Sequence, residues 1–381
     1  MVFMSEKIGK LNTICYLSPV FTPAIGGGVE YLELLSRYLL AEGACDKFII
    51  VTEAFPGAPK SELRSGGRLQ ILRKYPFRAG RDVKNFSSYL LYFWQNLKFI
   101  GLPFLLGRLS IDVLMVHGSF LNNPSSLWFV LRLFRYFSPN MRIIADLRDP
   151  KLPLRKISSL KLFDVIISCS ENITNRLSGD PDVFLKVREI PIIVEVSPPS
   201  RNDLDIIKKR YSVGTCLYVF NGSGLKKEKG VDRLIDLVAK IRQKGYNINL
   251  VIVGKRRYWG KRLEQATQEG WFHYLGQIDH YESMALAAGS WLDVNLSGVD
   301  SMPRHSLEAL LSGAKVLLPE GVPEFEKECP DCIAFEKSIE DLANKAIRIA
   351  NGELCSCRYD VKRHQPMSVI DGYMNVLEEI A

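Results

Sequence analysis

Two similar segments of the chain, one near its start and one past its middle, constrain the fold most. In each, an apolar run of strand length leads into a glycine-rich loop, and the loop leads into an amphipathic run of helix length. A strand, a loop and a helix of this kind open a doubly wound domain, in which parallel strands alternate with helices. The segments run from Thr13 to about Leu40 and from Cys216 to about Lys244. The sequence therefore predicts an α/β protein with two such domains.

The length of the chain supports this division. Its 381 residues suit two domains of about 150–200 residues better than one core. A proline-containing stretch at 191–201 reads as the linker. We expect a first domain at 1–195, a second at 196–365, and a C-terminal helix at 366–381 that crosses back to the first domain.

Composition excludes several other classes of protein. With 47% hydrophobic and 24% charged residues, the chain has the composition of a globular protein. No apolar run without charges reaches about 18 residues, so no membrane-spanning helix is expected. The first residues are polar and lack the apolar core of a signal peptide. These features predict a cytoplasmic protein.

The positive charge is concentrated in the first half. Residues 1–190 hold 25 Lys and Arg against 16 Asp and Glu, whereas residues 191–381 hold 25 against 26. Residues 73–108 are both basic and rich in aromatic side chains. They form either a domain helix that packs on the sheet or a face that rests on an anionic bilayer. The second alternative predicts peripheral attachment to the inner face of the membrane. We expect no nucleic-acid partner.

Four of the eight cysteines lie close together in the sequence, as Cys329, Cys332, Cys355 and Cys357. A four-thiolate zinc site is one interpretation of this spacing. The spacing of the last two is cramped for it, and we expect no metal.

The stretch 297–319 reads as a loop, a helix and a buried strand. Pro303 suits the first helical turn, and Asp300 or Ser301 is placed to cap it. The helix start around 303–306 offers backbone N–H groups and the positive end of a dipole, which together suit a phosphate. The predicted contacts there are Arg304, His305 and Ser306. The alternative is that Asp300 only caps the helix, while Glu308 pairs with Arg304 on the surface.

The spacing of Asp300 and Glu308, followed by 312–316, resembles the E-x7-E signature of GT-B glycosyltransferases. Retaining enzymes of the glycosyltransferase family 4 type are the most similar group. The departures are Asp300 in place of Glu, Ser301 in place of Gly and Lys315 in place of Pro.

The loop of the second domain resembles the same family. Leu225, Lys229 and the glycine after it match the pattern G-R-L-x-x-x-K-G, but Gly224 stands at the arginine position. The resemblance implies that Lys229 neutralises a diphosphate, with Lys226 or Lys227 as a substitute for the missing arginine and Gly222 in the same donor-binding loop. The alternative is a solvated turn.

The first domain carries two further candidates. The resemblance implies that Gly26, Gly27 and Gly28 face the diphosphate of a sugar nucleotide, although they also suit a tight turn. His117 ends an apolar strand, where ligands of such sheets bind. A histidine is common at this point in the family, so His117 is a predicted catalytic residue beside the sugar. A lone histidine is more often structural.

Taken together, the resemblance implies the GT-B fold, with two Rossmann-like domains facing each other across a cleft. It implies transfer of a sugar from a nucleotide-diphosphate-sugar donor to an acceptor hydroxyl on a glycan or a lipid-linked acceptor, with retention. The two Asp-x-Asp triplets, at 180–182 and 203–205, lie in loop or linker contexts, so we expect a reaction without a metal or other cofactor. Glu308 would hold the ribose, and Asp300 would contact the sugar as the second catalytic residue. A nucleotide-sugar epimerase and a degenerate, non-catalytic nucleotide-binding protein remain as alternatives.

Overall fold

The computed structural model describes residues 11–24, 26–75, 107–121, 126–148, 154–213, 216–354 and 357–381. The chain forms two compact units, one made of residues 1–193 with 365–381 and the other of residues 194–364. The predicted boundaries, 195/196 and 365/366, lie within two residues of these. No helix in the described ranges has the length and apolar character needed to cross a membrane.

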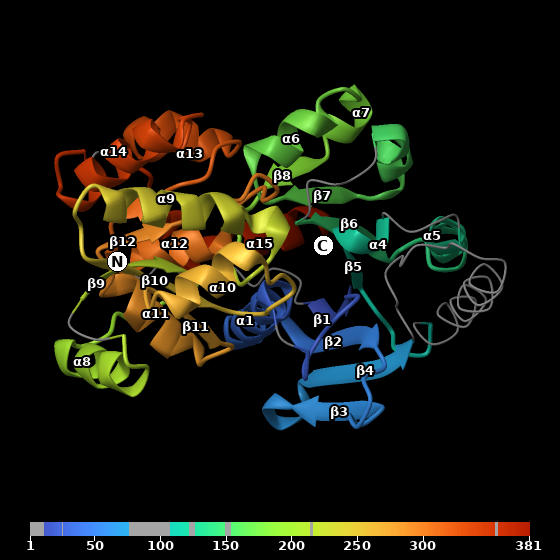
Figure 1. The fold of residues 1–381 in the computed structure, drawn as a ribbon. Helices are drawn as coiled ribbons and strands as arrows, with labels where there is room; N and C mark the ends of the chain where they lie inside the picture. Colours follow the sequence, from blue (N-terminus) through green and yellow to red (C-terminus); the bar gives the residue numbers. More distant parts are fainter. Residues whose placement is uncertain are drawn as a thin grey trace, which may run out of the picture. The chain divides into compact units, whose positions relative to one another are not determined.

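Unit 1 is built on an eight-stranded sheet of order β3-β4-β2-β1-β5-β6-β7-β8, in which only the edge strand β3 is antiparallel to its neighbour. In Figure 1, β3, β4, β2 and β1 lie side by side in blue. The strands are β1 Leu11–Leu17, β2 Cys45–Glu53, β3 Ser61–Arg64, β4 Leu69–Tyr75, β5 Val113–His117, β6 Arg142–Leu147, β7 Val165–Ser168 and β8 Val187–Glu189. Their apolar runs are buried, as expected of parallel strands covered on both faces.

Helices cover both faces of this sheet. One core joins α1 and α15 to one face, and the other core joins α5, η3 and α6 to the opposite face. The helical elements of unit 1 are α1 Gly27–Ala41, η1 Ser65–Gly67, α4 Gly118–Leu121, α5 Ser126–Phe137, η3 Leu154–Leu162, α6 Glu171–Leu177, α7 Pro181–Phe184 and α15 Pro366–Ile380. The C-terminal helix α15 thus completes the core of unit 1, although the chain reaches it from unit 2.

Unit 2 has a five-stranded parallel sheet of order β11-β10-β9-β12-β13. Its main core lies between the sheet and helices α9, α10 and α14. The strands are β9 Leu217–Asn221, β10 Ile248–Val253, β11 Phe272–Gly276, β12 Leu292–Val294 and β13 Val316–Leu317. The helical elements are α8 Arg201–Arg210, η4 Lys227–Lys229, α9 Val231–Gln243, α10 Lys261–Gln268, α11 His280–Ala288, α12 Arg304–Leu311, α13 Pro323–Glu328, η5 Pro330–Cys332, α14 Ile339–Ala350 and η6 Val361–His364.

The predicted glycine loops occupy the expected positions in both units. α1 follows β1 through a loop ending at Gly26, and α9 follows β9 through a loop ending at Gly230, which has a φ of 72°. The helix predicted within 297–319 is α12, and Gly313 behind it has the left-handed φ of 78° that suits a helix end. The predicted membrane-facing stretch 73–108 lies almost entirely outside the described residues.

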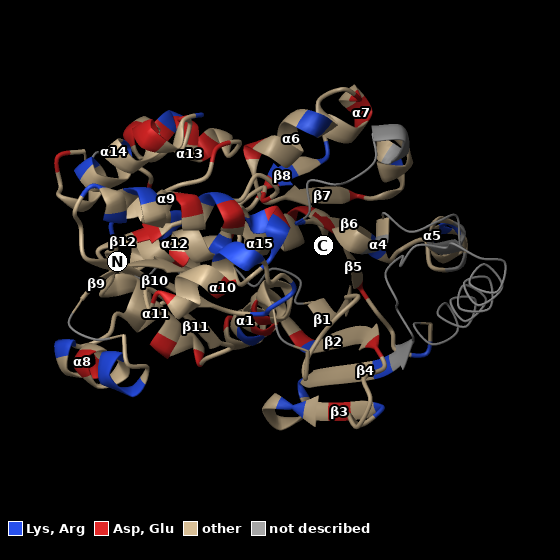
Figure 2. Cartoon of the chain, in the orientation of Figure 1, with Lys and Arg blue, Asp and Glu red and all other residues tan. Residues whose placement is uncertain are grey.

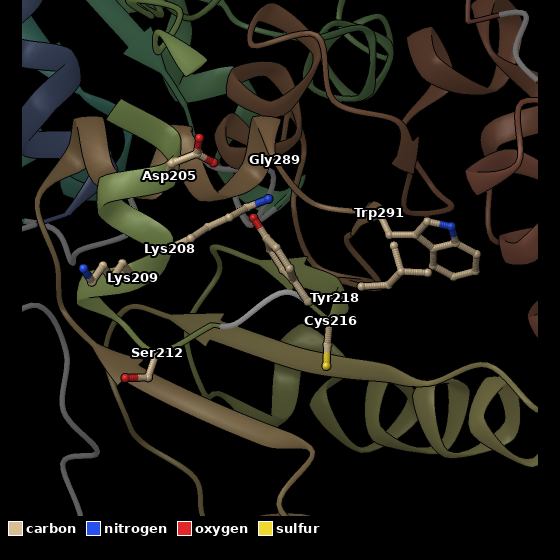
Figure 3. Close-up of a pocket in the computed structure, with 9 residues that line it drawn as sticks. Asp205, Lys208, Lys209, Ser212, Cys216, Tyr218, Gly289 and Trp291 are labelled. Atoms are coloured by element: carbon tan, nitrogen blue, oxygen red, sulfur yellow. The ribbon is translucent and has the colours of Figure 1, made fainter. Parts of the chain in front are cut away.

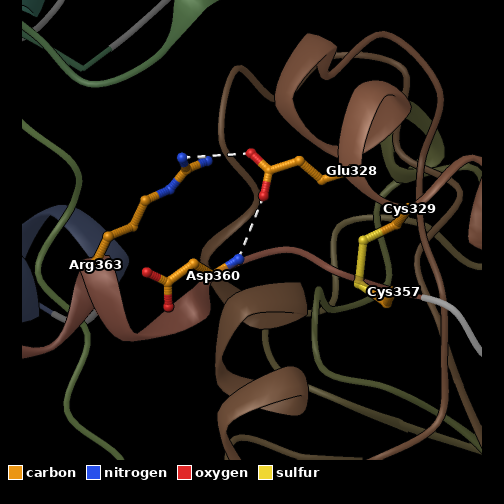
Figure 4. The surroundings of a disulfide bond; sticks show 5 residues. All are labelled: Glu328, Cys329, Cys357, Asp360 and Arg363. Carbon is orange, nitrogen blue, oxygen red and sulfur yellow. Dashed lines mark hydrogen bonds and ion pairs between the residues drawn. A yellow bond between two sulfur atoms is a disulfide. The ribbon is translucent and has the colours of Figure 1, made fainter.

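Two of the cysteines near the C-terminal end of unit 2 form a disulfide. Cys329, at the end of α13, is bonded to Cys357 (Figure 4). Glu328 binds the same segment, accepting from the backbone N–H of Asp360 at 3.3 Å and pairing with Arg363 at 3.5 Å. The alternative of four thiolates around zinc is therefore wrong, because two of those thiols are consumed in one covalent bond.

Candidate functional site

The order of the unit 2 strands identifies the edge at which a ligand is expected. From β9 the chain continues to β10 on one side, while β12 lies on the other side of β9. In open parallel sheets, ligands bind beyond the carboxyl ends of the strands where the order reverses in this way. The loops that follow β9 and β12 meet at this point, and both carry predicted site residues.

Glycine in the β9 loop allows the two loops to approach. A Cβ atom on Gly222 would lie 2.2 Å from Nδ1 of His305, and a Cβ on Gly230 would lie 2.4 Å from the carbonyl oxygen of Leu296. Both contacts are far shorter than packed atoms allow, so any larger residue would push the β12 loop away. Gly222 therefore has a close-packing role.

Lys229 and Asp300, each predicted to contact the donor, form an ion pair with each other. The Lys229 ammonium donates to both carboxylate oxygens of Asp300, at 2.6 Å to Oδ2. Both side chains are partly exposed, at 17% and 24%. The expectation that Asp300 or Ser301 caps α12 is wrong, because Pro303 holds the cap position and no side chain accepts there.

The side chains of His305 and Ser306 point into unit 2. His305 is buried, and its Nε2 lies 2.7 Å from Oδ2 of Asp293. Ser306 is fully buried and accepts from the amide of Asn295 at 3.0 Å. The backbone N–H of Ser306 donates to the carbonyl of Pro303, so this N–H is not available to a phosphate as we expected.

The pair of His305 and Asp293 combines burial with opposite charge. Burial disfavours the imidazolium, but the charge and hydrogen bond of Asp293, together with the charge of Glu308, outweigh burial and raise the pKa of His305 above 6.5. Nε2 also lies 3.0 Å from the backbone N–H of Gly222. A ring nitrogen donates a hydrogen bond when it is protonated and accepts one when it is not. Nε2 therefore donates to Asp293 in its protonated form and accepts from the N–H of Gly222 in its unprotonated form. His305 therefore links the two loops.

Glu308 pairs with Arg304, one turn earlier on α12, at 2.7 Å. The sequence alternative placed this pair on a wet surface, but Glu308 is only 5% exposed. His280, at the start of α11, lies 3.7 Å from the same carboxylate. A buried carboxylate held by a cation is rigidly placed, which suits a binding role.

Lys226 adds positive charge to this edge. Burial lowers the pKa of its ammonium, and the charges of Lys229 and Arg257 lower it further, against the opposing effects of Glu228 and Asp300. Figure 2 shows Lys and Arg where α9 and α10 begin. The site in unit 2 thus combines glycine loops, clustered cations and two carboxylates.

Unit 1 has its own reversal of strand order, between β1 and β5. Gly26, Gly27 and Gly28 follow β1, are exposed, and begin α1, where the carbonyl of Gly26 accepts from Val29 at 2.9 Å. His117 ends β5 and is half-buried. Its Nδ1 accepts from the backbone N–H of Ser119 at 3.1 Å.

A buried polar cluster beside His117 was missed by the sequence analysis. Asp146 is fully buried and accepts from Tyr16 at 2.5 Å and from Arg148 at 2.6 Å. Arg148 also donates to Tyr31 and Tyr373. Burial opposes the charge of Arg148, but Asp146 and the tyrosines raise its pKa. The available signal was a charged residue at the end of an otherwise apolar strand.

Two cavities lie away from the predicted site residues. One of about 690 Å³ in unit 2 is lined by residues of α8 and of the amino ends of β9 and β12, among them Lys208, Tyr218 and Trp291 (Figure 3). Another of about 750 Å³ in unit 1 is lined by Asn12, Asp112 and Arg142, at the amino ends of β1, β5 and β6. Neither includes a predicted site residue, and both lie at the sheet edge opposite to the one where such folds bind ligands.

Comparison with known proteins is consistent with this geometry. Residues 206–359 match the family model described as glycosyl transferases group 1. No curated protein sequence matches the chain significantly.

Among solved structures, the chain is similar to HepE from Anabaena in complex with UDP and glucose, with a TM-score of 0.67, 14% identity and coverage of 97% of this chain and 100% of HepE. It is similar to a structure from E. coli described as trehalose-6-phosphate bound with UDP-2-fluoro glucose, with a TM-score of 0.65, 15% identity and 97% coverage of both chains. Sucrose-phosphate synthase from Thermosynechococcus elongatus matches with a TM-score of 0.66, 15% identity and coverage of 97% and 96%. The chain therefore has the fold of GT-B glycosyltransferases.

Proposed function

We propose that this protein is a glycosyltransferase that moves a sugar from a nucleotide-diphosphate-sugar donor to an acceptor hydroxyl. One observation carries the proposal most: the loops after β9 and β12 bring Lys229, Lys226 and Asp300 together at the reversal of strand order, within the region that matches the glycosyltransferase model. The solved relatives with UDP or a UDP-sugar support a nucleotide-sugar as the donor.

In the proposed reaction, the bond between the anomeric carbon and the β-phosphate oxygen breaks, and a bond from that carbon to the acceptor oxygen forms. The proton of the acceptor hydroxyl passes to the leaving phosphate. Lys229 and Lys226 stabilise the negative charge that develops on the diphosphate, which is the kind of electrostatic stabilisation that contributes most in many enzymes. A metal is not required in this proposal, because Lys229 and Lys226 supply the positive charge that a metal ion would otherwise supply.

The remaining assignments follow the resemblance. Glu308, fixed by Arg304, binds the ribose, and Asp300 contacts the transferred sugar. Asp300 can contact the sugar only if Lys229 gives up one of its two hydrogen bonds to the Asp300 carboxylate. Lys229 then donates to the diphosphate instead. In unit 1, His117 and Gly26–Gly28 stay predicted contacts of the sugar and the diphosphate. Retention, similarity to glycosyltransferase family 4, a hexosyl donor, a lipid-linked acceptor and a cytoplasmic or membrane-surface location are likewise parts of the proposal.

The proposal is tested by incubating the protein with a panel of nucleotide-sugars and a mixture of glycan and lipid-linked acceptors, and measuring nucleoside diphosphate release and product mass. Glu308→Gln removes a charge-assisted contact, and such contacts contribute about 1.5–3 kcal/mol, so the donor KM should rise about tenfold or more. Asp300→Asn should lower kcat/KM by a similar factor. Glu264→Gln, an exposed residue of α10, is the matched control and should leave both unchanged.

Two outcomes would contradict the assignment. Full transfer activity in both Asp300→Asn and Glu308→Gln would exclude these carboxylates from the site. Nucleotide binding with no turnover of any donor would favour a non-catalytic protein, and interconversion of the donor sugar without an acceptor would favour an epimerase.

A further inference from the structure

The loop after β10 packs against the glycine loop after β9 backbone to backbone. Gly224 has a φ of 78°, and a Cβ there would lie 2.8 Å from the carbonyl oxygen of Lys255. Gly254 has a φ of 114°, and a Cβ there would lie 3.0 Å from the Cα of Gly224. No side chain fits at position 224 in this conformation, so a cation for this part of the site has to come from another position.

Backbone hydrogen bonds hold the two loops in register. The N–H of Leu225 donates to Lys255 at 3.0 Å, and the carbonyl of Leu225 accepts from Arg257 at 2.8 Å and from Tyr258 at 3.1 Å. The hydroxyl of Tyr258 donates to Asp232 on α9 at 2.8 Å. Because Lys226 follows Leu225 directly, Arg257 is fixed beside the cationic edge of unit 2.

The charges at this edge do not balance. Lys229 is matched by Asp300, and the guanidinium of Arg256 lies over the ring of Trp259, 5.3 Å from its centre. Neither Lys226 nor Arg257 forms a salt bridge with any residue in the described ranges, and Arg257 is exposed. The lowered pKa of Lys226 reflects burial and then this excess of positive charge. A ligand with more than one negative charge would relieve it.

We propose that Arg257, which the loop after β10 brings beside Lys226, is a further donor-binding residue that contacts the diphosphate together with Lys226. This inference rests on the proposed function. Each phosphate of a nucleotide-diphosphate-sugar carries a negative charge, and another develops on the leaving oxygen when the bond to the sugar breaks. Lys226 and Arg257 match the charges of the bound donor. Lys229, released from Asp300, matches the charge that develops.

The test compares two variants with two neighbouring controls. Lys226→Met and Arg257→Gln each remove one of the proposed contacts, while Lys227→Met and Arg256→Gln remove one positive charge each from adjacent positions. Binding is measured by isothermal titration with UDP, GDP and ADP, using for all variants the nucleotide that the unaltered protein binds most tightly. We expect the first two variants to bind it about tenfold more weakly, since a charge-assisted contact is worth about 1.5–3 kcal/mol. The two controls should bind within about twofold of the unaltered protein, and circular dichroism checks that all four are folded.

The possible failures differ in meaning. If the unaltered protein binds a nucleoside diphosphate and Arg257→Gln binds it equally well, the role of Arg257 is wrong while the proposed function stands. If all four variants lose affinity equally, the effect is the general field of the protein, and the proposed contact is again wrong. If the unaltered protein binds none of the three nucleotides, the proposed function fails and this inference fails with it.

Discussion

Polar residues in the unit 2 site are held mainly by one another. Asp293, on β12, and His305, on α12, form a buried pair, and Asn221 at the end of β9 donates to the carbonyl of Val294 at 2.6 Å. A buried charge is tolerated only when it is paired, so these contacts impose a single arrangement on the loops. The exposed cations are placed by this buried layer beneath them.

The His305 pair should be visible in the pH dependence of the protein. Because Asp293 raises the pKa of His305 above its ordinary 6.5, the pair stabilises the fold fully below about pH 6.5, and this contribution is lost as the pH rises through the raised value. In Asp293→Asn, burial still lowers the pKa of His305, but the carboxylate that raises it is gone. The pKa of His305 should therefore fall, and the protein should no longer lose stability as the pH rises above 6.5.

The measurement is an NMR titration of the histidine ring protons, with denaturant unfolding at each pH. His273, whose pKa is lowered by burial, is an internal control whose titration should not change. An unchanged pKa for His305 would show that Asp293 is not its controlling partner.

Individual helices and strands of unit 1 are joined by the cluster of Asp146 and Arg148. Asp146 belongs to β6, Tyr31 to α1 and Tyr373 to α15, so one guanidinium connects three elements that are far apart in the sequence. Breaking a buried ion pair leaves an uncompensated charge and typically costs about 3–5 kcal/mol.

We therefore expect Arg148→Met to lower the free energy of unfolding by about 3–5 kcal/mol, because it leaves the buried Asp146 unpaired. The control is Arg188→Met, whose partner Glu379 is 46% exposed, and this change should cost about 1 kcal/mol or less. Denaturant unfolding measures both. The double change Asp146→Asn with Arg148→Met should recover part of the loss, and a double variant as unstable as Arg148→Met would contradict the pairing argument.

The disulfide joins α13 to the segment before α15. It closes a loop between positions 28 residues apart, and cross-links that close loops of this size stabilise by about 3–4 kcal/mol. Reduction should lower the free energy of unfolding by that amount. The double variant Cys329→Ser with Cys357→Ser should show the lower stability with and without reductant, and a variant that still responds to reductant would point to another bond.

Residues 365–381 belong to unit 1, and we expect the stability of unit 1, but not that of unit 2, to depend on them. Helix α15 belongs to unit 1 and buries six residues there: Val369, Ile370, Tyr373, Val376, Leu377 and Ile380. Removal of a contiguous apolar face exposes the core it covers, and that costs more than surface changes do.

Removal of residues 365–381 should therefore destabilise unit 1 selectively. Hydrogen exchange followed by mass spectrometry should show faster exchange in β1, β5 and α1, while β9, β10 and α9 keep their protection. Equal loss of protection in both units would show that α15 supports the whole chain. Replacing Met367, which is 47% exposed on the same helix, with Ala is the control and should leave both patterns unchanged.

Prediction from the sequence succeeded where a local pattern carries the information. The strand before His117, the glycine loops and the helix ending before Gly313 all follow from runs of apolar residues and from backbone conformations that favour glycine. Helix α8 was missed, because its start lies in a proline-rich stretch that reads as a linker, and its only buried residue is Ile207.

The sequence by itself determined that this chain forms two α/β units, because the alternation of apolar strands, glycine loops and amphipathic helices is written within neighbouring residues. Only the tertiary structure decided which side chains meet. Lys229 and Asp300 are 71 residues apart, and they form a pair because β9 and β12 are neighbours in the sheet. The same pairing of strands turns His305 inward to Asp293. Such contacts depend on the order of strands and on burial, and these arise only when distant segments pack together.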